Sequence, residues 1–250
     1  IWIEDLNTVL DDNKILTLAN GDRIPMTANV KIMFEVETLV NASPATVSRA
    51  GIIYVSDTDL DWTPTMEAWV MKQPSNQHAQ LRSLITKYLG ASCPTDPGPF
   101  MDYMNRHCNN VMSLSRVGVT TALGELFRGL TEGKDCIDIS VDREVRTERI
   151  FLFALFWSVG GVLDVPGRHK MDEYIRGVDS KFMPPLNGPE ETIFEYFVTA
   201  AGEWSFWKPP KWHYPTGVEK LDFSNLLVPT MDSTRANYNC YHMHKQKKSV

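Results

Sequence analysis

Cysteine is scarce in this sequence of 250 residues, which contains four: Cys93, Cys108, Cys136 and Cys240. No two of them form a CxxC pair, which excludes the redox and zinc motifs built on that spacing. A chain of this length can also bury enough apolar surface to fold without covalent links. We therefore expect reduced thiols, the normal state in a cytosolic type of compartment.

Long apolar runs are missing as well. The longest, residues 150–163, falls short of the roughly 20 residues that span a bilayer, and we predict a buried helix there. The opening Ile1-Trp2-Ile3 is not a basic segment followed by an apolar stretch, which is the mark of a signal peptide. The sequence thus predicts neither a signal peptide nor a membrane partner.

Basic residues are fewer than acidic ones. Twenty-five Lys and Arg against 31 Asp and Glu give a net charge of −6, the wrong sign for a protein that holds nucleic acid through its phosphates. Hydrophobic residues make up 43% and charged residues 22% of the chain. Both values are near the globular average and exclude a disordered chain. We expect a folded protein with no nucleic-acid partner.

The common catalytic motifs GxxxxGK[ST], GxGxxG, GxSxG and HExxH do not occur. His107 and Cys108 are adjacent, so on a helix they point in different directions and make a poor base and nucleophile pair. His242 and His244 are two residues apart, which favours a strand and predicts two surface side chains. The Asp11-Asp12 pair lacks the glutamate that closes a calcium loop. We therefore predict no metal site.

An α/β pattern opens the chain. Residues 15–18 and 23–26 flank Asn20-Gly21, a pair that tolerates the positive φ angles of a tight turn, and predict a β-hairpin. Val30, Ile32 and Phe34 alternate with Lys31, Met33 and Glu35, which predicts a strand at residues 30–34. Residues 52–55 form a continuous apolar run typical of a buried parallel strand. A short helix lies between these two predicted strands, which makes a strand, helix, strand unit.

That short helix carries the most informative side chain. Ser43 is the predicted N-cap, Pro44 takes the first helical position and Gly51 follows the end. Arg49 then lies in the last turn. A guanidinium on a rigid helix end can reach a phosphate across an interface and supply the positive charge that phosphoryl transfer needs. The alternative is that Arg49 makes a plain ion pair at the surface.

The periodicity becomes helical from Thr63 onward. Predicted helices cover 64–73, 81–90, 100–108, a stretch around 123–130, 150–163 and a stretch around 171–175, with a loop at 93–99. The aromatic segment 192–214, with Trp204, Trp207 and Trp212, is interrupted by proline and predicts a hairpin or strap that completes a core or an interdomain seam. Residues 222–250 predict a helix from Asp232 and a strand at the very end.

Four segments resemble the motor region of dynein heavy chains, and they occur in the same order as in that family. They are residues 7–14 (NTVLDDNK), 33–36 (MFEV), 42–49 (ASPATVSR) and 227–230 (LVPT). The family is a ring of six AAA+ modules in one polypeptide. The resemblance places this chain in the second module, from just after its Walker B strand, and in the first residues of the third module.

The resemblance implies an α/β fold class. Residues 1–74 would be the C-terminal part of an AAA+ large subdomain, a parallel sheet with helices. Residues 75–221 would be a helical small subdomain, the lid, with its aromatic strap. Residues 222–250 would begin the third module.

The resemblance also assigns roles to individual residues. Arg49, which closes the SPATVSR motif, resembles the arginine finger that the second module offers in trans to ATP on the first. Glu35 lies where AAA+ proteins place the first sensor residue, usually asparagine, and this departure suits a module that binds nucleotide without hydrolysing it. Val228 and Pro229 resemble the loop that contacts adenine in the third module. No sensor-two arginine is identified in the lid.

The implied cofactor is ATP or ADP with Mg²⁺, and the implied activity is that of part of an ATPase motor. The implied partners are the neighbouring AAA+ modules, a microtubule contacted through other parts of the chain, and dynein light and intermediate chains. Residues 192–197 and 202–207 are more similar to axonemal, outer-arm-type chains than to the cytoplasmic form, which implies the axoneme of a cilium or flagellum, with the cytoplasm as the alternative. The alternative from another class is a non-catalytic helical interaction module.

Overall fold

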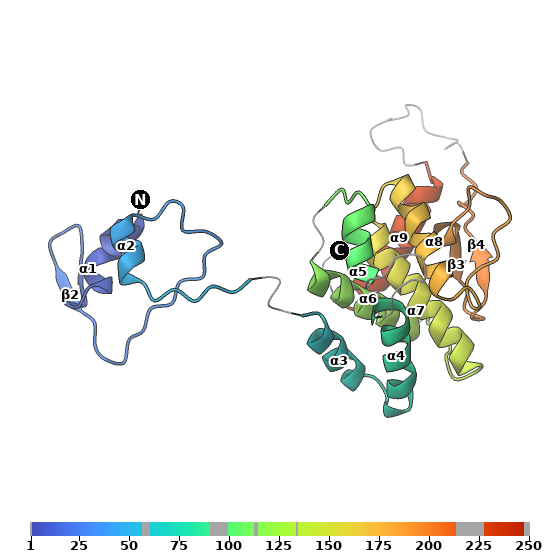
Figure 1. The fold of residues 1–250 in the computed structure, drawn as a ribbon, viewed down its shortest axis with the longest axis horizontal. Coiled ribbons are helices and arrows are strands. Elements are labelled where there is room, and N and C mark those ends of the chain that lie inside the picture. Colours follow the sequence, from blue (N-terminus) through green and yellow to red (C-terminus); the bar gives the residue numbers. More distant parts are fainter. Residues whose placement is uncertain are drawn as a thin grey trace. The chain divides into compact units, whose positions relative to one another are not determined.

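The computed structural model describes residues 2–56, 61–90, 100–112, 115–133, 135–213 and 228–247. Contacts within the chain divide it into two compact units, with the division after Ser56. The first unit is small and mostly irregular, whereas the second is built mainly from helices (Figure 1).

The first unit contains a 3-10 helix, two short α-helices and a hairpin. Its elements are η1 (Trp2–Leu6), α1 (Asn7–Leu10), β1 (Ile15–Thr17), β2 (Arg23–Pro25) and α2 (Pro44–Arg49). β1 and β2 pair antiparallel, with Leu16 opposite Ile24. Gly21 in the connecting turn has φ +91°, a conformation that glycine adopts without a steric penalty. The predicted hairpin is confirmed.

The parallel sheet predicted for residues 30–34 and 52–55 is not confirmed. Both segments are irregular in the structure, and their apolar side chains are exposed, Ile53 to 89%. A strand needs neighbours to satisfy its N–H and C=O groups. Among residues 2–56 the only strands are β1 and β2, which pair with each other, so nothing there pairs with the two segments.

The second unit confirms the predicted helices. Its elements are α3 (Thr63–Lys72), η2 (Ser75–Gln77), α4 (His78–Ile85), a π-helical turn η3 (Thr86–Gly90), α5 (Phe100–His107), α6 (Arg116–Thr131), α7 (Arg143–Gly160), α8 (Val165–Val178), η4 (Ile193–Glu195), β3 (Tyr196–Val198), β4 (Trp204–Phe206) and α9 (Met231–Lys245). The loop predicted at 93–99 and the strand predicted at the end, from residue 248 on, lie outside the described residues.

α7 forms the centre of the core. Every residue from Ile150 to Phe156 is buried, as predicted for this apolar run, and α6 packs along it. Near the end of α7, Gly160 meets the ring of Phe194 so closely that a Cβ atom would lie 1.9 Å from it. The helix end and η4 therefore fit together only because residue 160 has no side chain.

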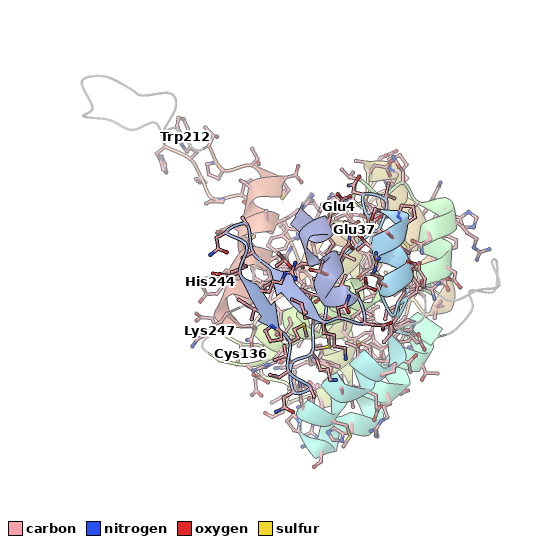
Figure 2. All side chains as sticks on the ribbon, turned by 90° about the vertical axis from the view of Figure 1, so that its left-hand side faces the viewer. Glu4, Glu37, Cys136, Trp212, His244 and Lys247 are labelled. Atoms are coloured by element: carbon pink, nitrogen blue, oxygen red, sulfur yellow. The ribbon has the colours of Figure 1, made fainter. Side chains whose placement is uncertain are left out.

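The aromatic segment forms the predicted hairpin, because β3 and β4 pair antiparallel. Trp207 is buried and stacks on Phe197 with ring centroids 4.6 Å apart. The indole N–H of Trp204 donates to the carbonyl of Phe182 at 2.7 Å. Both tryptophans thus complete the core, as predicted, whereas Trp212 is more exposed (Figure 2).

α9 packs against α6, and here the prediction for the two histidines is wrong in part. They lie on a helix rather than a strand, and His242 is only 3% exposed, whereas His244 is exposed (Figure 2). Nδ1 of His242 donates to the carbonyl of Gly129 at 2.9 Å, and burial lowers the pKa of His242. A Cβ atom on Gly129 would lie 2.4 Å from the carbonyl oxygen of His242, so the two backbones touch.

Candidate functional site

The predicted helix around residues 43–51 is α2, and its start is fixed by the expected cap. The backbone N–H of Thr46 donates to Oγ of Ser43, and Pro44 occupies the first turn. The helix ends at Arg49, with extended backbone at Ala50. Arg49 therefore lies in the last turn, as predicted.

A buried side chain of α2 forms a hydrogen bond to α1. Thr46 is buried, and its hydroxyl donates to Oδ1 of Asn7 at 2.9 Å. Asn7 is the first residue of α1. Because a hydroxyl taken out of water needs its hydrogen bond, this contact fixes how α1 and α2 face each other.

Arg49 makes two contacts within the first unit. Its Nε lies 3.4 Å from Oδ1 of Asp11, and its Nη1 donates to the carbonyl of Ala45 at 3.1 Å. The side chain is 32% exposed. An arginine has a fork of N–H donors, so these two contacts leave others for a ligand. The surface ion pair considered from the sequence is present, and the same geometry leaves Arg49 able to bind an anion.

The other predicted site residues are spread over both units. Glu35 is exposed on irregular backbone of the first unit. Val228 and Pro229 belong to the second unit and directly precede α9, whose N-terminus is capped by Thr230 in a reciprocal pair with Ser233. Glu35 and Arg49 thus share a unit with no contact described between them, and Val228 with Pro229 forms a separate candidate.

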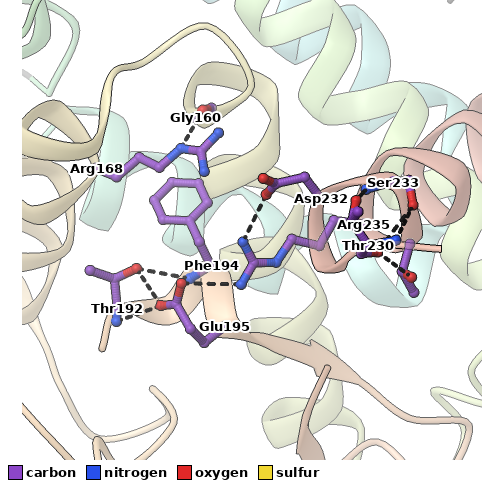
Figure 3. A network of polar contacts seen from close by, with 10 residues as sticks. Gly160, Arg168, Thr192, Phe194, Glu195, Thr230, Asp232, Ser233 and Arg235 are labelled. Carbon is purple, nitrogen blue, oxygen red and sulfur yellow. Dashed lines mark hydrogen bonds and ion pairs between the residues drawn. The ribbon is translucent and has the colours of Figure 1, made fainter. Parts of the chain in front are cut away.

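Two arginines of the second unit, Arg168 and Arg235, line a cavity of about 380 Å³ between α6, α7, α8 and α9. Arg235 is buried between the carboxylates of Glu195 and Asp232, each at 3.2 Å. Arg168 donates to the carbonyl of Gly160, and its guanidinium lies 5.1 Å from the ring centroid of Phe194 (Figure 3). Neither arginine was predicted, because the contacts to Glu195 and Phe194 join residues that are distant in the sequence.

A second polar cluster connects the π-helical turn to α7 and to the end of α8. Nζ of Lys87 donates to Glu148 at 2.6 Å and also to Asp179, while the hydroxyl of Tyr88 donates to Glu148 at 2.5 Å. The hydrogen bond from Lys87 lowers the pKa of Asp179. Burial alone would lower the pKa of Lys87, but its bonds to Asp179 and Glu148 outweigh burial and raise it. We interpret the cluster as structural.

Replacing Lys87 with methionine should lower the free energy of unfolding by about 3 kcal/mol at pH 7, because Glu148, whose side chain is 6% exposed, loses its counter-charge. The pKa of Asp179 lies below its ordinary 3.8 and that of Lys87 above its ordinary 10.5. The ion-pair stability is therefore fully present between these values. It is lost as the pH falls through the folded pKa of Asp179 or rises through that of Lys87.

Urea unfolding of the parent chain and of Lys87→Met, followed between pH 2 and 7, measures this difference. Lys72→Met, at an exposed site on α3, is the matched control and should stay within about 0.5 kcal/mol of the parent. If the difference in free energy of unfolding between Lys87→Met and the parent stays the same size in acid, the loss comes from packing and not from charge.

No metal centre is apparent in the described part of the chain. No group of three or more His, Cys, Asp and Glu side chains that could hold a metal ion lies there. Cys108, Cys136 and Cys240 are free thiols, as predicted for these three, and burial raises the pKa of Cys108, which keeps it protonated. The helices that the structure describes are all too short or too polar to cross a membrane.

Comparison with known proteins decides the family. Residues 97–209 match the family described as "Dynein heavy chain AAA lid domain". The chain is also 41% identical over 238 residues, 94% of its length, to "Dynein gamma chain, flagellar outer arm" of Chlamydomonas reinhardtii. The chain belongs to the dynein heavy chains. Other similar dyneins are axonemal heavy chain 8 of Homo sapiens and axonemal heavy chain 5 of Rattus norvegicus, each 37% identical along the whole chain.

The lid match runs from before α5 to just after β4. It supports the predicted helical small subdomain of the AAA+ fold, and the dynein resemblance read from the sequence is confirmed. The chain spans only 5% of the Chlamydomonas and human dyneins and 7% of the rat dynein.

Proposed function

We propose that this chain is part of an ATP-driven, microtubule-based dynein motor ring, and that Arg49 is an arginine finger for ATP bound on the preceding AAA+ module. The observation that carries the proposal is the mounting of Arg49 at the end of a capped helix, with N–H donors left over from its two contacts. Membership of the dynein heavy chains supports the wider role.

Arg49 suits this chemistry because of its shape as well as its charge. In phosphoryl transfer, negative charge develops on the oxygens of the γ-phosphate, and a planar guanidinium can meet two of them at once. A finger from a neighbouring module also makes hydrolysis depend on how the two modules pack. This dependence can couple ATP turnover to the movement of packed units between discrete arrangements.

The proposed modules are those that the dynein resemblance implies: residues 1–74 close the large subdomain of the second module, 75–221 form its lid and 222–250 open the third module. We infer that residues 30–34 and 52–55 become strands of one parallel sheet when the rest of the large subdomain is present. Their support is the apolar pattern together with the exposure of these side chains in the first unit. Burial against neighbouring strands would remove that apolar surface from water.

Nucleotide contacts are proposed at two further places. Glu35 would stand at the first sensor position of a module that holds nucleotide without turnover. Val228 and Pro229 would contact the adenine of ATP or ADP in the third module. Mg²⁺ would accompany the nucleotide at sites completed by other parts of the motor.

The proposed partners are the adjoining AAA+ modules of the same heavy chain, dynein light and intermediate chains, and a microtubule contacted elsewhere on the heavy chain. The proposed location is the axoneme of a cilium or flagellum, because the similar proteins include a flagellar outer-arm chain and axonemal heavy chains. No specific observation favours the alternative of a non-catalytic interaction module.

A map of the complete motor with a non-hydrolysable ATP analogue on the preceding module tests the proposal. We expect the guanidinium of Arg49 within hydrogen-bonding distance of a terminal phosphate oxygen, and residues 30–34 and 52–55 as strands of one sheet. Arg49 turned toward solvent and far from nucleotide in every state would refute the finger. Irregular backbone at both segments would refute the sheet.

A further inference from the structure

Two polar contacts join α1 to α2, and they are spaced like successive turns of the two helices. Asn7 and Asp11 are four residues apart, and Thr46 and Arg49 are three apart, so each pair falls on one face of its segment. Asn7 bonds to Thr46, and Asp11 pairs with Arg49. Asp11 is itself held at the end of α1, because its N–H donates to the carbonyl of Asn7 at 3.1 Å. The first contact therefore sets the register in which the second forms.

Asp11 holds a defined part of the guanidinium. It faces Nε at 3.4 Å, and the carbonyl of Ala45 accepts from Nη1 at 3.1 Å. A long arginine side chain samples many rotamers when it is free, whereas these two contacts restrict the direction of the group. The donors that they do not use remain together at the outer side of the fork.

We propose that Asp11 is a positioning residue for Arg49: it fixes the guanidinium so that the unused donors face an incoming γ-phosphate. The proposal rests on the function proposed for Arg49. Asp11 brings a negative charge near the phosphate, but its side chain is 46% exposed, so water and salt screen that charge. The gain from orientation outweighs the weakened repulsion, because a reacting group displaced by about 1 Å can lose a hundredfold in rate.

The complete dynein heavy chain carrying Asp11→Ala tests this assignment by steady-state kinetics. We expect kcat for ATP to fall about tenfold and KM to change less than about twofold, because the ATP-binding groups belong to the other module. Asp11→Glu keeps the carboxylate and should recover part of the loss. Asp12→Ala is the matched control, since Asp12 is exposed beside Asp11, and its kcat should equal that of the parent.

A double variant separates positioning from a general structural effect. If Asp11 acts through Arg49, adding Asp11→Ala to Arg49→Ala should cost no further turnover. Should Asp11→Ala fail to fold, the isosteric Asp11→Asn gives the same test with a smaller loss. An unchanged or raised kcat, a loss of the same size in Asp12→Ala, or losses that multiply in the double variant would overturn the assignment.

The result for Arg49→Ala alone tells the two proposals apart. If that variant turns over ATP like the parent, the finger itself fails and the role of Asp11 fails with it. If Arg49→Ala lowers turnover while Asp11→Ala does not, the finger stands and only the positioning role is lost.

Discussion

Replacing Arg49 with alanine in the complete dynein heavy chain should lower steady-state ATP turnover about a thousandfold or more, the range known for arginine fingers. The reason is that the guanidinium meets charge that exists only as the phosphoryl group transfers, so its loss raises the barrier without weakening the bound state. Affinity of the preceding module for a labelled ATP analogue should therefore stay largely intact. Phosphate release and analogue binding, measured on the same preparation, check both parts.

Two further variants sharpen this test. Arg49→Lys keeps the charge but loses the fork, and its turnover should fall between those of the parent and Arg49→Ala. Arg23→Ala removes an exposed arginine of the same unit, on β2, and should leave turnover at the parental value. Equal turnover in Arg49→Ala and Arg23→Ala would rule out the finger.

Gly160→Ala should destabilise the helical unit by about 2–3 kcal/mol, although alanine normally favours a helix over glycine. The added Cβ would lie 1.9 Å from the ring of Phe194. That ring has little room to move, because Phe156 and Trp157 each pack edge-on against it with centroids 5.4 Å apart. Thermal unfolding of the chain should show a midpoint lowered by roughly 4–12 °C.

The neighbouring glycine provides the control. A Cβ on Gly161 would meet only the carbonyl oxygen of Trp157, at 3.8 Å, so Gly161→Ala should leave the midpoint unchanged or slightly raised. Adding Phe194→Leu to Gly160→Ala should recover part of the loss, since the smaller side chain relieves the overlap. Similar midpoints for the two alanine variants would contradict the close contact.

The sequence predicts the helices of both units well because their signals are local. Ser43 and Pro44 mark the start of α2, and the apolar spacing of Leu81, Leu84 and Tyr88 gives one buried face. His242 shows the limit of such signals. Its spacing from His244 indicates a strand, whereas the structure has a helix that buries His242 against the backbone of α6. A contact across more than a hundred residues leaves no trace in a short window of sequence.

The candidate site, too, is only partly predictable from the sequence. Arg49 stands out by its place in a capped helix and by the dynein resemblance, and both are sequence features. The roles of Asp11 and Asn7 depend on how α1 meets α2, which no periodicity reveals. Segments 30–34 and 52–55 have the composition of strands, but a strand is completed by its neighbours and not by its own residues.

The touching backbones of α6 and α9 have a mechanical consequence. Gly129 places no side chain between α6 and α9, and His242 hydrogen-bonds from one helix to the other. α9 therefore cannot shift relative to α6 without breaking these contacts. The ring of Tyr238, on α9, also packs edge-on against Phe153 and Trp207. A rotation of the helical unit would therefore move α9 and the preceding Pro229 with it. Any nucleotide bound at Pro229 would be displaced by the same rotation.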